Sequence, residues 1–594
     1  MKKFLALVLC IVMVLSIVAC GKADDEGKKG TEAKKVSTPT LTYLYNTSEG
    51  HKAIGEYLQQ ALSVAGITMK LENQEWATFL ETRKNGDYGI ARNGWVADYN
   101  DPICFLDMWT SISGNNDVQF GKGAHAKLKM YNLDLTKFGY DIKVENGTWA
   151  ETYDVLISTI KTCTDSNNRY AMMHLAEDML METGCIVPLY FYTDLYMADD
   201  SINGFFSNPL GYKYFMGTDV NGDTTSLPIC LSSEPQTLDP ALNSAVDGAT
   251  MVAHLFSGLA KWSQDDAGKL VIAPDAAEEL VEGVVNEDGT VTYTYTIKEG
   301  MKWSNGDEVK ASDYANAWKR AASADLGADY GYMFEVVKGY AEGELAVEAD
   351  DAARTITVTL ANAVAYWDEL LAFPTYFPVH PSAYDNDAWA TDPSTYICNG
   401  AYTITAWEHD SLITLTKNAN YHDADSVKMN ELKVYLSDDS NNMLANFKNE
   451  SWLFIDDVPT QEIKTLEKEY PEEFVVAGQI GTYYVCFNIN VDLLPGSDLT
   501  GVEKEKAQQE IRTAMGLLFD RNYIVEDVAQ GGQKPASGYV PSGMIDADGS
   551  EFYMNSGDNE GFVGYFDVAE EAFADNCAKA IKILTKYYDN IKTN

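Results

Sequence analysis

The sequence predicts a mixed α/β protein, and three observations support this class. Residues 41–74 read as strand, helix and strand, because apolar residues recur at helical spacing between two short apolar runs. Residues 170–192 place a second helical pattern directly before the continuous apolar run CIVPLYFY. Residues 291–297 alternate in period two, between Asp288-Gly289 and Asn305-Gly306, which are signals for hairpin turns.

Each of the two predicted helices has one apolar stripe and a glycine where it should end, Gly66 and Gly184. We expect both stripes to pack in the core. Because the second stripe contains methionines, the alternative for it is a methionine-rich binding face. The two stripes consist of Ile54, Tyr57, Leu58, Ala61, Leu62 and Ala65, and of Met172, Leu175, Ala176, Met179 and Leu180.

The amino terminus has the pattern of a cleaved secretory signal. Lys2 and Lys3 precede an apolar run that ends at Ala19, and this run is too short to span a bilayer comfortably. Cys20 follows at a position that resembles a bacterial lipobox, so we expect residues 1–19 to be removed and Cys20 to carry lipid. The alternative is an ordinary secretory signal with a chance cysteine. Residues 20–38 have almost no apolar content and predict a disordered tether. The protein should then lie at the outer face of the cytoplasmic membrane.

Composition excludes several partners. The chain carries 44 basic and 89 acidic residues, a net charge of −45, which argues against nucleic acid and against docking on anionic lipid. Beyond Cys20 there are seven scattered cysteines, which show neither a disulfide framework nor the spacing of a metal site. We therefore expect no metal and no cofactor.

The sequence lacks the common enzyme templates, including the nucleophile elbow, the phosphate-binding loops and the H-E-x-x-H zinc motif. DVNGD at 219–223 starts like a calcium loop, but Thr224 stands where glycine is needed and Cys230 where glutamate is needed. We interpret it as a polar linker. Acidic pairs are too numerous for counting to find or exclude a glycosidase site, so a hydrolase stays an alternative to our expectation of a protein that is not an enzyme.

Long motifs in both halves of the chain resemble one family. They are ARNGWVADYNDP, YNTSEGHK, LENQEWATFLETRKNGDYG and VPLYFYTD in the first part, and SEPQTLDPALNSAVDGA, YTIKEGMKWSNGDEVKASDYANAWKR, NGAYTITAWEHD, TYYVCFNIN and FDRNYIVEDVAQGGQKPASGYVPSGM in the second. The chain is similar to the extracytoplasmic oligopeptide-binding proteins of ABC importers, the family 5 solute-binding proteins. The resemblance covers nearly the whole chain after residue 38.

This resemblance implies a two-lobed, periplasmic-binding-protein-like α/β fold of type II with three subdomains. It implies a monomer that closes around an oligopeptide and delivers it to an ABC permease. Other members of the superfamily bind dipeptides, nickel, haem or sugars, so these solutes stay open as alternatives. A permuted remnant that no longer binds ligand is a further alternative.

The order of the motifs is exchanged relative to the family, which indicates a circular permutation. Fusion of fragments from two tandem paralogues, or an assembly error, would give the same order. We expect the family's original ends to meet near 218–226, with residues 216–231 as a surface bridge. The expected parts are a second lobe at 39–186 and 481–594, a first lobe at 187–260 and 396–480, and an additional α/β subdomain of the first lobe at 261–395.

The resemblance also implies the ligand-binding residues. Asp98, in the ADY motif, falls on the family's anchor for the peptide's free amino group. Arg83, Arg92 and His51 fall on positions that receive the peptide carboxylate at different lengths. The remaining positions are two aromatic pocket residues, one residue whose backbone pairs with the ligand, and two weaker aromatic matches: Trp76, Trp95, Val246, Tyr192 and Tyr484.

Overall fold

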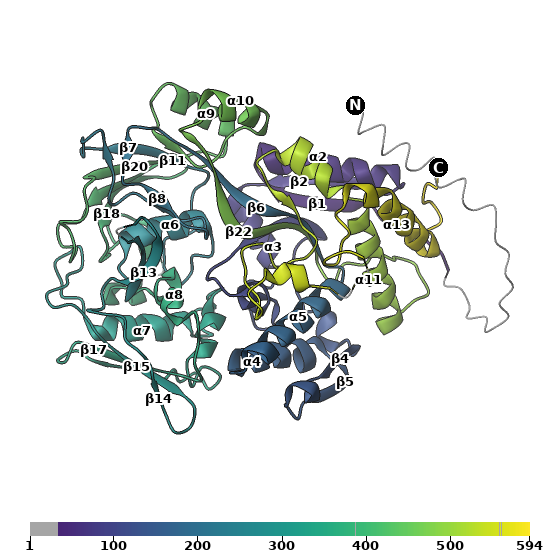
Figure 1. The fold of residues 1–594 in the computed structure, drawn as a ribbon, viewed down its shortest axis with the longest axis horizontal. Coiled ribbons are helices and arrows are strands. Elements are labelled where there is room, and N and C mark those ends of the chain that lie inside the picture. The colour runs from purple at the N-terminus through teal and green to yellow at the C-terminus, as the bar shows by residue number, and fades with distance from the viewer. Residues whose placement is uncertain (1–33, 266, 387, 558, 560, 594) are drawn as a thin grey trace.

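The computed structural model describes residues 34–265, 267–386, 388–557, 559 and 561–593. The predicted signal peptide, Cys20 and most of the predicted tether lie outside the described residues. One eleven-stranded sheet runs through the molecule in the order β18-β19-β20-β11-β21-β6-β22-β3-β1-β2, with β23 paired to β6. It joins two lobes, which we call the first lobe (β18–β21 and β11) and the second lobe (β1–β3), seen left and right in Figure 1. No helix in the described part of the chain is long and apolar enough to cross a bilayer.

The second lobe combines the two ends of the chain. Parallel strands β1, β2 and β3 form its sheet, and helices from both ends pack around it, as the purple and yellow segments in Figure 1 show. Its main elements are β1 (Leu41–Asn46), α2 (Glu49–Val64), β2 (Met69–Gln74), α3 (Trp76–Lys84), β3 (Ile90–Val96), β4 (Tyr131–Asp134), β5 (Lys143–Gly147), α4 (Val155–Thr162), α5 (Ser166–Glu182), α11 (Gly501–Leu517), β23 (Lys534–Pro535) and α13 (Phe573–Tyr587).

Two long antiparallel strands, β6 (Ile186–Ala198) and β22 (Phe474–Phe487), belong to both lobes. The amino-terminal half of β6 pairs with the carboxyl-terminal half of β22 beside β3, and the other halves pair beside β21. Their register shifts between Gly478 and Thr482. Such an irregularity bends a strand locally, so the connection between the lobes is centred on residues 479–481.

The first lobe continues the same sheet. β11 lies parallel to β20 and β21, and β18, β19 and β20 follow as antiparallel neighbours. Its elements are β7 (Ile202–Asn203), β8 (Phe206–Ser207), β9 (Lys213–Tyr214), β10 (Asp219–Val220), β11 (Leu227–Leu231), α6 (Val246–Leu255), β18 (Tyr402–Glu408), β19 (Leu412–Lys417), β20 (Glu431–Leu436), α9 (Ser440–Lys448), β21 (Phe454–Ile455) and α10 (Ile463–Glu469).

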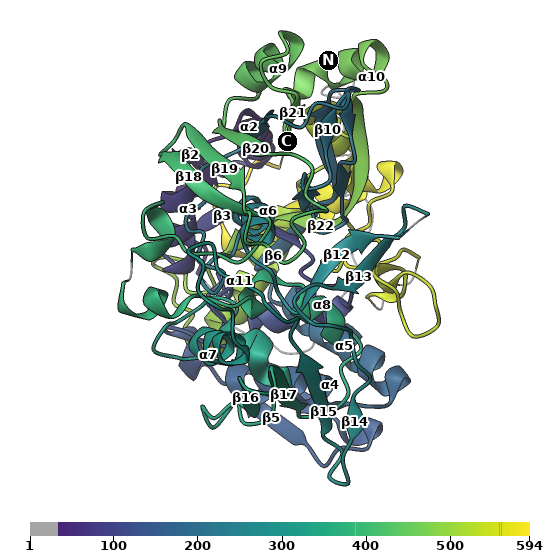
Figure 2. The same cartoon turned by 90° about the vertical axis from the view of Figure 1, so that its left-hand side faces the viewer.

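The additional subdomain of the first lobe has its own four-stranded sheet, in the order β14-β15-β17-β16. Figure 2 shows this sheet and α7 at the same end of the molecule. Its elements are β12 (Ala260–Gln264), β13 (Leu270–Pro274), β14 (Val284–Val285), β15 (Val291–Thr296), α7 (Ala311–Ala321), β16 (Val347–Asp350), β17 (Thr355–Leu360) and α8 (Trp367–Leu371).

The elements predicted from periodicity are present. The two apolar stripes lie on α2 and α5 and pack in the core, so the methionines of α5 are core residues and form no binding face. Gly66 and Gly184 follow these helices with φ of 91° and 65°, a left-handed backbone that glycine adopts without strain. The alternating segment forms β15, and Asp288-Gly289 turns it back onto β14. Asn305-Gly306 does not turn β15 back onto a neighbouring strand. It closes a separate tight turn between Lys302 and Glu308, and the second neighbour of β15 is β17.

The last part of the predicted tether is ordered. Val36 is only 9% exposed, and its backbone pairs with the end of α13 and the residues after it, through hydrogen bonds to Tyr587 and from Asp589. The expectation of disorder up to residue 38 was therefore wrong at its end, because Val36 is an apolar residue that the second lobe can bury.

The expected surface bridge is shorter than residues 216–231. β10 pairs with β7, and an exposed turn follows at Asn221 and Gly222, both with positive φ. Residues 227–231 are not part of the surface, because LPICL is an apolar run that forms the buried strand β11 inside the sheet.

Candidate functional site

Two adjoining cavities lie between the lobes, with volumes of about 900 Å³ and about 330 Å³. Both receive residues from each lobe. The second lobe contributes His51 and Trp76 to both, and the first lobe contributes Ser232 and Asp456 to both. The site is therefore assembled only when the lobes are together.

Most of the residues expected from the resemblance line the smaller cavity. Eight of the nine are found there: His51, Trp76, Arg83, Arg92, Trp95, Asp98, Tyr192 and Val246. Strand β3 explains the central part of this arrangement, since alternate residues of a strand face the same side. Arg92, Gly94 and Val96 thus form one row that continues to Asp98. A Cβ at Gly94 would lie 2.1 Å from the Tyr192 hydroxyl oxygen, so glycine makes room for that ring.

Asp98 is a buried carboxyl group, and one of its two oxygens has no hydrogen-bond partner among the described residues. Its side chain is 7% exposed, and its Oδ1 accepts a hydrogen bond of 2.9 Å from the Tyr330 hydroxyl of the additional subdomain. Its Oδ2 has no hydrogen-bond partner among the described residues. Burial raises the pKa of this carboxyl well above its ordinary value, and Asp107 adds to the rise although the Tyr330 hydrogen bond opposes it. A cation placed at Oδ2 would satisfy the oxygen and favour the ionised form.

Arg92 supplies a positive charge to the same cavity. Its guanidinium lies 5.3 Å from the ring centre of Tyr483 and 5.9 Å from that of Trp76, which is the geometry of cation–π contacts. Its Nε has no hydrogen-bond partner, and no carboxylate of the described residues forms an ion pair with it. Its remaining polar contacts are with the hydroxyls of Tyr192 and Tyr483, so Arg92 can receive an anion without breaking an ion pair.

Arg83 differs from Arg92 because its charge is compensated. Its Nε lies 2.7 Å from Asp117 Oδ2, and both side chains are almost fully buried. The guanidinium also packs over Phe79. From the sequence alone, a plain surface charge was as good an interpretation of Arg83 as a ligand-binding role, and its burial contradicts the surface position. A ligand carboxylate would have to compete with Asp117 for it.

His51 lines both cavities as a neutral imidazole. Burial first, and Arg92 second, lower the pKa of His51 well below its ordinary value. A neutral ring brings no positive charge to a carboxylate but can donate a hydrogen bond to it, so the role of His51 at the peptide carboxylate stays a prediction. Its Nδ1 lies 3.3 Å from the Tyr483 hydroxyl.

The other predicted residues form walls. Trp76 begins α3, and its buried Nε1 has no partner, whereas Trp95 donates to the Cys104 carbonyl at 3.1 Å. Val246 begins α6 and lines the smaller cavity. The first N–H groups of a helix have no acceptor within it, so pairing of the Val246 backbone with a ligand stays a prediction.

Tyr484 does not reach either cavity. It is fully buried against Trp109 and Tyr539. Successive residues of a strand face opposite sides, and on β22 the neighbouring Tyr483 is the one that contacts His51 and Arg92. The resemblance therefore selected the strand β22, which does contact cavity residues, but a residue on the opposite face of that strand.

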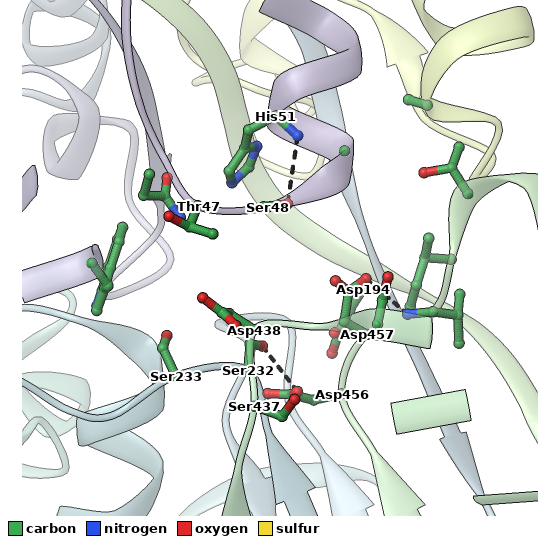
Figure 3. Close-up of a pocket in the computed structure, with 18 of the residues that line it drawn as sticks. Thr47, Ser48, His51, Asp194, Ser232, Ser233, Ser437, Asp438, Asp456 and Asp457 are labelled. Carbon is green, nitrogen blue, oxygen red and sulfur yellow. Dashed lines mark hydrogen bonds between the residues drawn. The ribbon is translucent and has the colours of Figure 1, made fainter. Parts of the chain in front are cut away.

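The larger cavity contains acidic residues that sequence reasoning missed. Figure 3 shows Asp438, Asp456 and Asp457 facing Thr47 and His51 across it. Burial raises the pKa of Asp456 to about 7 and that of Asp457 to about 6. These acids come from separate segments of an acid-rich chain, so no spacing in the sequence could have singled them out.

The comparisons with known proteins agree with this geometry. The model of the "Bacterial extracellular solute-binding proteins, family 5 Middle" matches residues 21–117 and 271–587, well over half of the chain. The oligopeptide-binding protein OppA of Bacillus subtilis is 31% identical over 388 residues, 63% of this chain and 66% of the relative. The dipeptide-binding protein DppE of the same organism is 30% identical over 335 residues, 55% of this chain and 57% of the relative. The chain thus spans less than two thirds of the length of either.

A solved structure supports the fold. The Escherichia coli murein tripeptide binding protein MppA matches with a TM-score of 0.51 at 21% identity, over 61% of this chain and 66% of the other. This likeness concerns the architecture of two lobes around a cleft. Together with the match of the family model, it means that the chain belongs to family 5 of the bacterial extracellular solute-binding proteins.

Proposed function

We propose that the protein is a lipid-anchored extracytoplasmic receptor that captures oligopeptides between its lobes and delivers them to an ABC permease. The observation that carries this proposal is the bare, buried Oδ2 of Asp98 in the smaller cavity. A buried carboxylate is costly when unpaired, and the ammonium of a free peptide amino terminus would compensate it. The names of the two curated relatives, which bind oligopeptides and dipeptides, support the same ligand class.

The second charge fits the other end of a peptide. Arg92 faces the same cavity as Asp98, from six residues earlier along the row of β3. An arginine fork matches a carboxylate. A ligand with an ammonium at one end and a carboxylate at the other would therefore find a partner for both ends, and its side chains could enter the larger cavity.

The test is calorimetric titration of the protein with a tetrapeptide and with its N-acetylated form. Free peptide should bind more tightly, because acetylation removes the charge that Asp98 pairs with. Equal binding of the two would remove Asp98 from its role. Chromatography after incubation should return the peptide uncleaved, and fragments whose appearance depends on the protein would favour a hydrolase.

The exchanged chain order is also part of the proposal. Residues 36–38 lie against residues 587–590, with the Thr38 amide donating to Asn590 at 2.9 Å. The order of the family would need only a short loop between these segments. The exposed turn at 221–222 is a suitable place for the family's original ends to have been joined. The match of one family model in two separate segments fits the same explanation.

A further inference from the structure

Two lysines of the second lobe pair with acids of the additional subdomain, one of them away from the ligand cavities and one at the edge of the smaller cavity. Lys161 near the end of α4 lies 2.7 Å from Glu335, and Lys84 at the end of α3 pairs with Asp329. Both acids belong to one short segment, residues 329–335. We call these four residues the inter-lobe latch.

Lys161 has a partner in each lobe. Its Nζ lies 2.7 Å from Glu335 Oε2 and 3.1 Å from Asp107 Oδ2, which belongs to its own lobe. The side chains of Lys161 and Asp107 are 7% and 3% exposed, whereas that of Glu335 is 22% exposed. When the lobes separate, Lys161 keeps Asp107 as counter-charge and Glu335 passes into water. The contact can therefore form and break without leaving an unpaired charge buried in the protein.

The backbones approach each other at the same place. The Asn362 side chain donates a hydrogen bond of 2.7 Å to the Lys161 carbonyl. A Cβ added at Gly114 of the second lobe would lie 2.5 Å from the Cα of Asp329. The lobes are thus in direct contact around the latch, and a glycine is needed for the chains to come so close.

The Lys161–Glu335 pair does not belong to the ligand site. Neither residue lines the two ligand cavities, and both line a third cavity of about 1140 Å³ between the lobes. Lys84 does line the smaller ligand cavity. For this reason Glu335 is the residue at which the latch can be opened without touching the ligand.

We propose that the inter-lobe latch sets the fraction of closed molecules before any ligand is bound, and so scales the affinity for every ligand by one common factor. The effect on ligands rests on the proposed function. The physical reason is that the ligand site is complete only in the closed form, and apparent affinity is proportional to the competent fraction. The latch itself makes no distinction between ligands.

The experiment uses the full chain with Glu335→Gln, which keeps the shape and removes the charge. Small-angle scattering of the empty variant should give a larger radius of gyration than the wild type, and saturating tetrapeptide should restore the wild-type value. Calorimetry should give affinities lowered by about three- to tenfold for the free and the N-acetylated tetrapeptide alike, as expected for a partly exposed charged hydrogen bond.

Glu342→Gln is the matched control, because Glu342 lines the same third cavity, is exposed and loses one negative charge in the same way. It should leave both measurements unchanged. Glu335→Asp retains the charge on a shorter side chain. Its radius of gyration and its affinities should lie between those of the wild type and those of Glu335→Gln.

An unchanged radius and unchanged affinities in Glu335→Gln would overturn the latch. So would a loss confined to one of the two peptides, since that would place Glu335 in ligand recognition. If the wild type binds no peptide, the proposed function fails, but scattering of the empty proteins still decides whether the latch controls closure.

Discussion

The two ligand cavities treat charge differently. In the smaller one, Arg83 is paired with Asp117, Arg92 lies against aromatic rings, and Asp98 is held at one oxygen by Tyr330. The larger one is lined, among the described residues, by no lysine or arginine and by seven carboxyl side chains: Glu75, Asp194, Glu234, Asp410, Asp438, Asp456 and Asp457. Asp194 and Asp456 also line the smaller cavity, and Asp194 is paired there with Lys213 at 2.7 Å. The comparison teaches that the groups that bind the two ends of a ligand, and the groups that favour one sign of ligand charge, can lie in different parts of one cleft.

The largest expected effect concerns the fixed anion. Asp98→Asn should weaken binding of a free tetrapeptide by about 2–5 kcal/mol, because it leaves the ligand's ammonium poorly paired. The N-acetylated peptide should be almost unaffected. Titration calorimetry measures both. Asp141→Asn, an exposed change of equal charge outside the cavities, is the control. A parallel loss in the control would assign the effect to net charge.

The fixed cation should come next. Arg92→Met should weaken binding by about 1.5–3 kcal/mol for a peptide with a free carboxylate, the range for a hydrogen bond to a charged group, and by much less for its C-terminal amide. Arg83→Met should lower the free energy of unfolding but leave the ratio of the two peptides' dissociation constants unchanged, since Asp117 already compensates Arg83. Lys137→Met is an exposed control of the same charge. If Arg83→Met changes this ratio and Arg92→Met does not, Arg83 is the residue that binds the ligand carboxylate.

The acidic cavity should reveal itself in stability against pH. The pKa of Asp456 is raised from 3.8 to about 7. Between these values the folded protein holds a proton that the unfolded chain has released, so this group lowers the stability as pH rises from about 4 through 7. Asp456→Asn should therefore stabilise the empty protein at pH 8 relative to pH 5, by roughly 1–2 kcal/mol after allowance for partial exposure. Thermal unfolding at both pH values is the measurement. Asp410→Asn, in the same cavity but exposed, should show no such difference.

A smaller effect is expected on the choice of ligand. Of two tetrapeptides that differ by lysine or glutamate at an internal position, the lysine peptide should bind more tightly by about 0.5–1 kcal/mol at low salt. Added salt should reduce this difference. Competition titrations at two ionic strengths would show it. A preference for glutamate would mean that side chains do not enter the acidic cavity.

The smallest effect is expected from the chain order. A gene that starts at Ser226 and joins Asn594 to Pro39 should give a protein with the same far-ultraviolet spectrum and a peptide affinity within about tenfold. The cut follows the exposed Thr225, and residues 36–38 already lie beside residues 587–590, so a short connection can join the two segments. Limited proteolysis checks the native order. If the block 39–215 is digested as an unfolded segment, the two blocks do not form one fold.

Periodicity predicted α2, α5, β6 and β15, because apolar spacing reports directly which face of an element is buried. It could not predict that β6 and β22 run through both lobes, since their pairing joins residues nearly 300 positions apart. The motif resemblance brought eight residues to one cavity but failed at Tyr484, where a shift of one position reverses the side. It also could not show that Asp117 neutralises Arg83, because that partner lies outside the quoted motifs.

The pairing of Val36 with the end of α13 and the residues after it has a mechanical consequence. If Cys20 is anchored as proposed, a pull on the tether reaches the protein first through the hydrogen bond from the Lys34 amide to Asp498, and then through the backbone bonds of Val36 to Tyr587 and from Asp589. The load then passes into the second lobe, which is held near the membrane, while the first lobe is the part free to swing. Opening the cleft would move the wall that carries Asp456 and Asp457 and leave the wall that carries Asp98 in place.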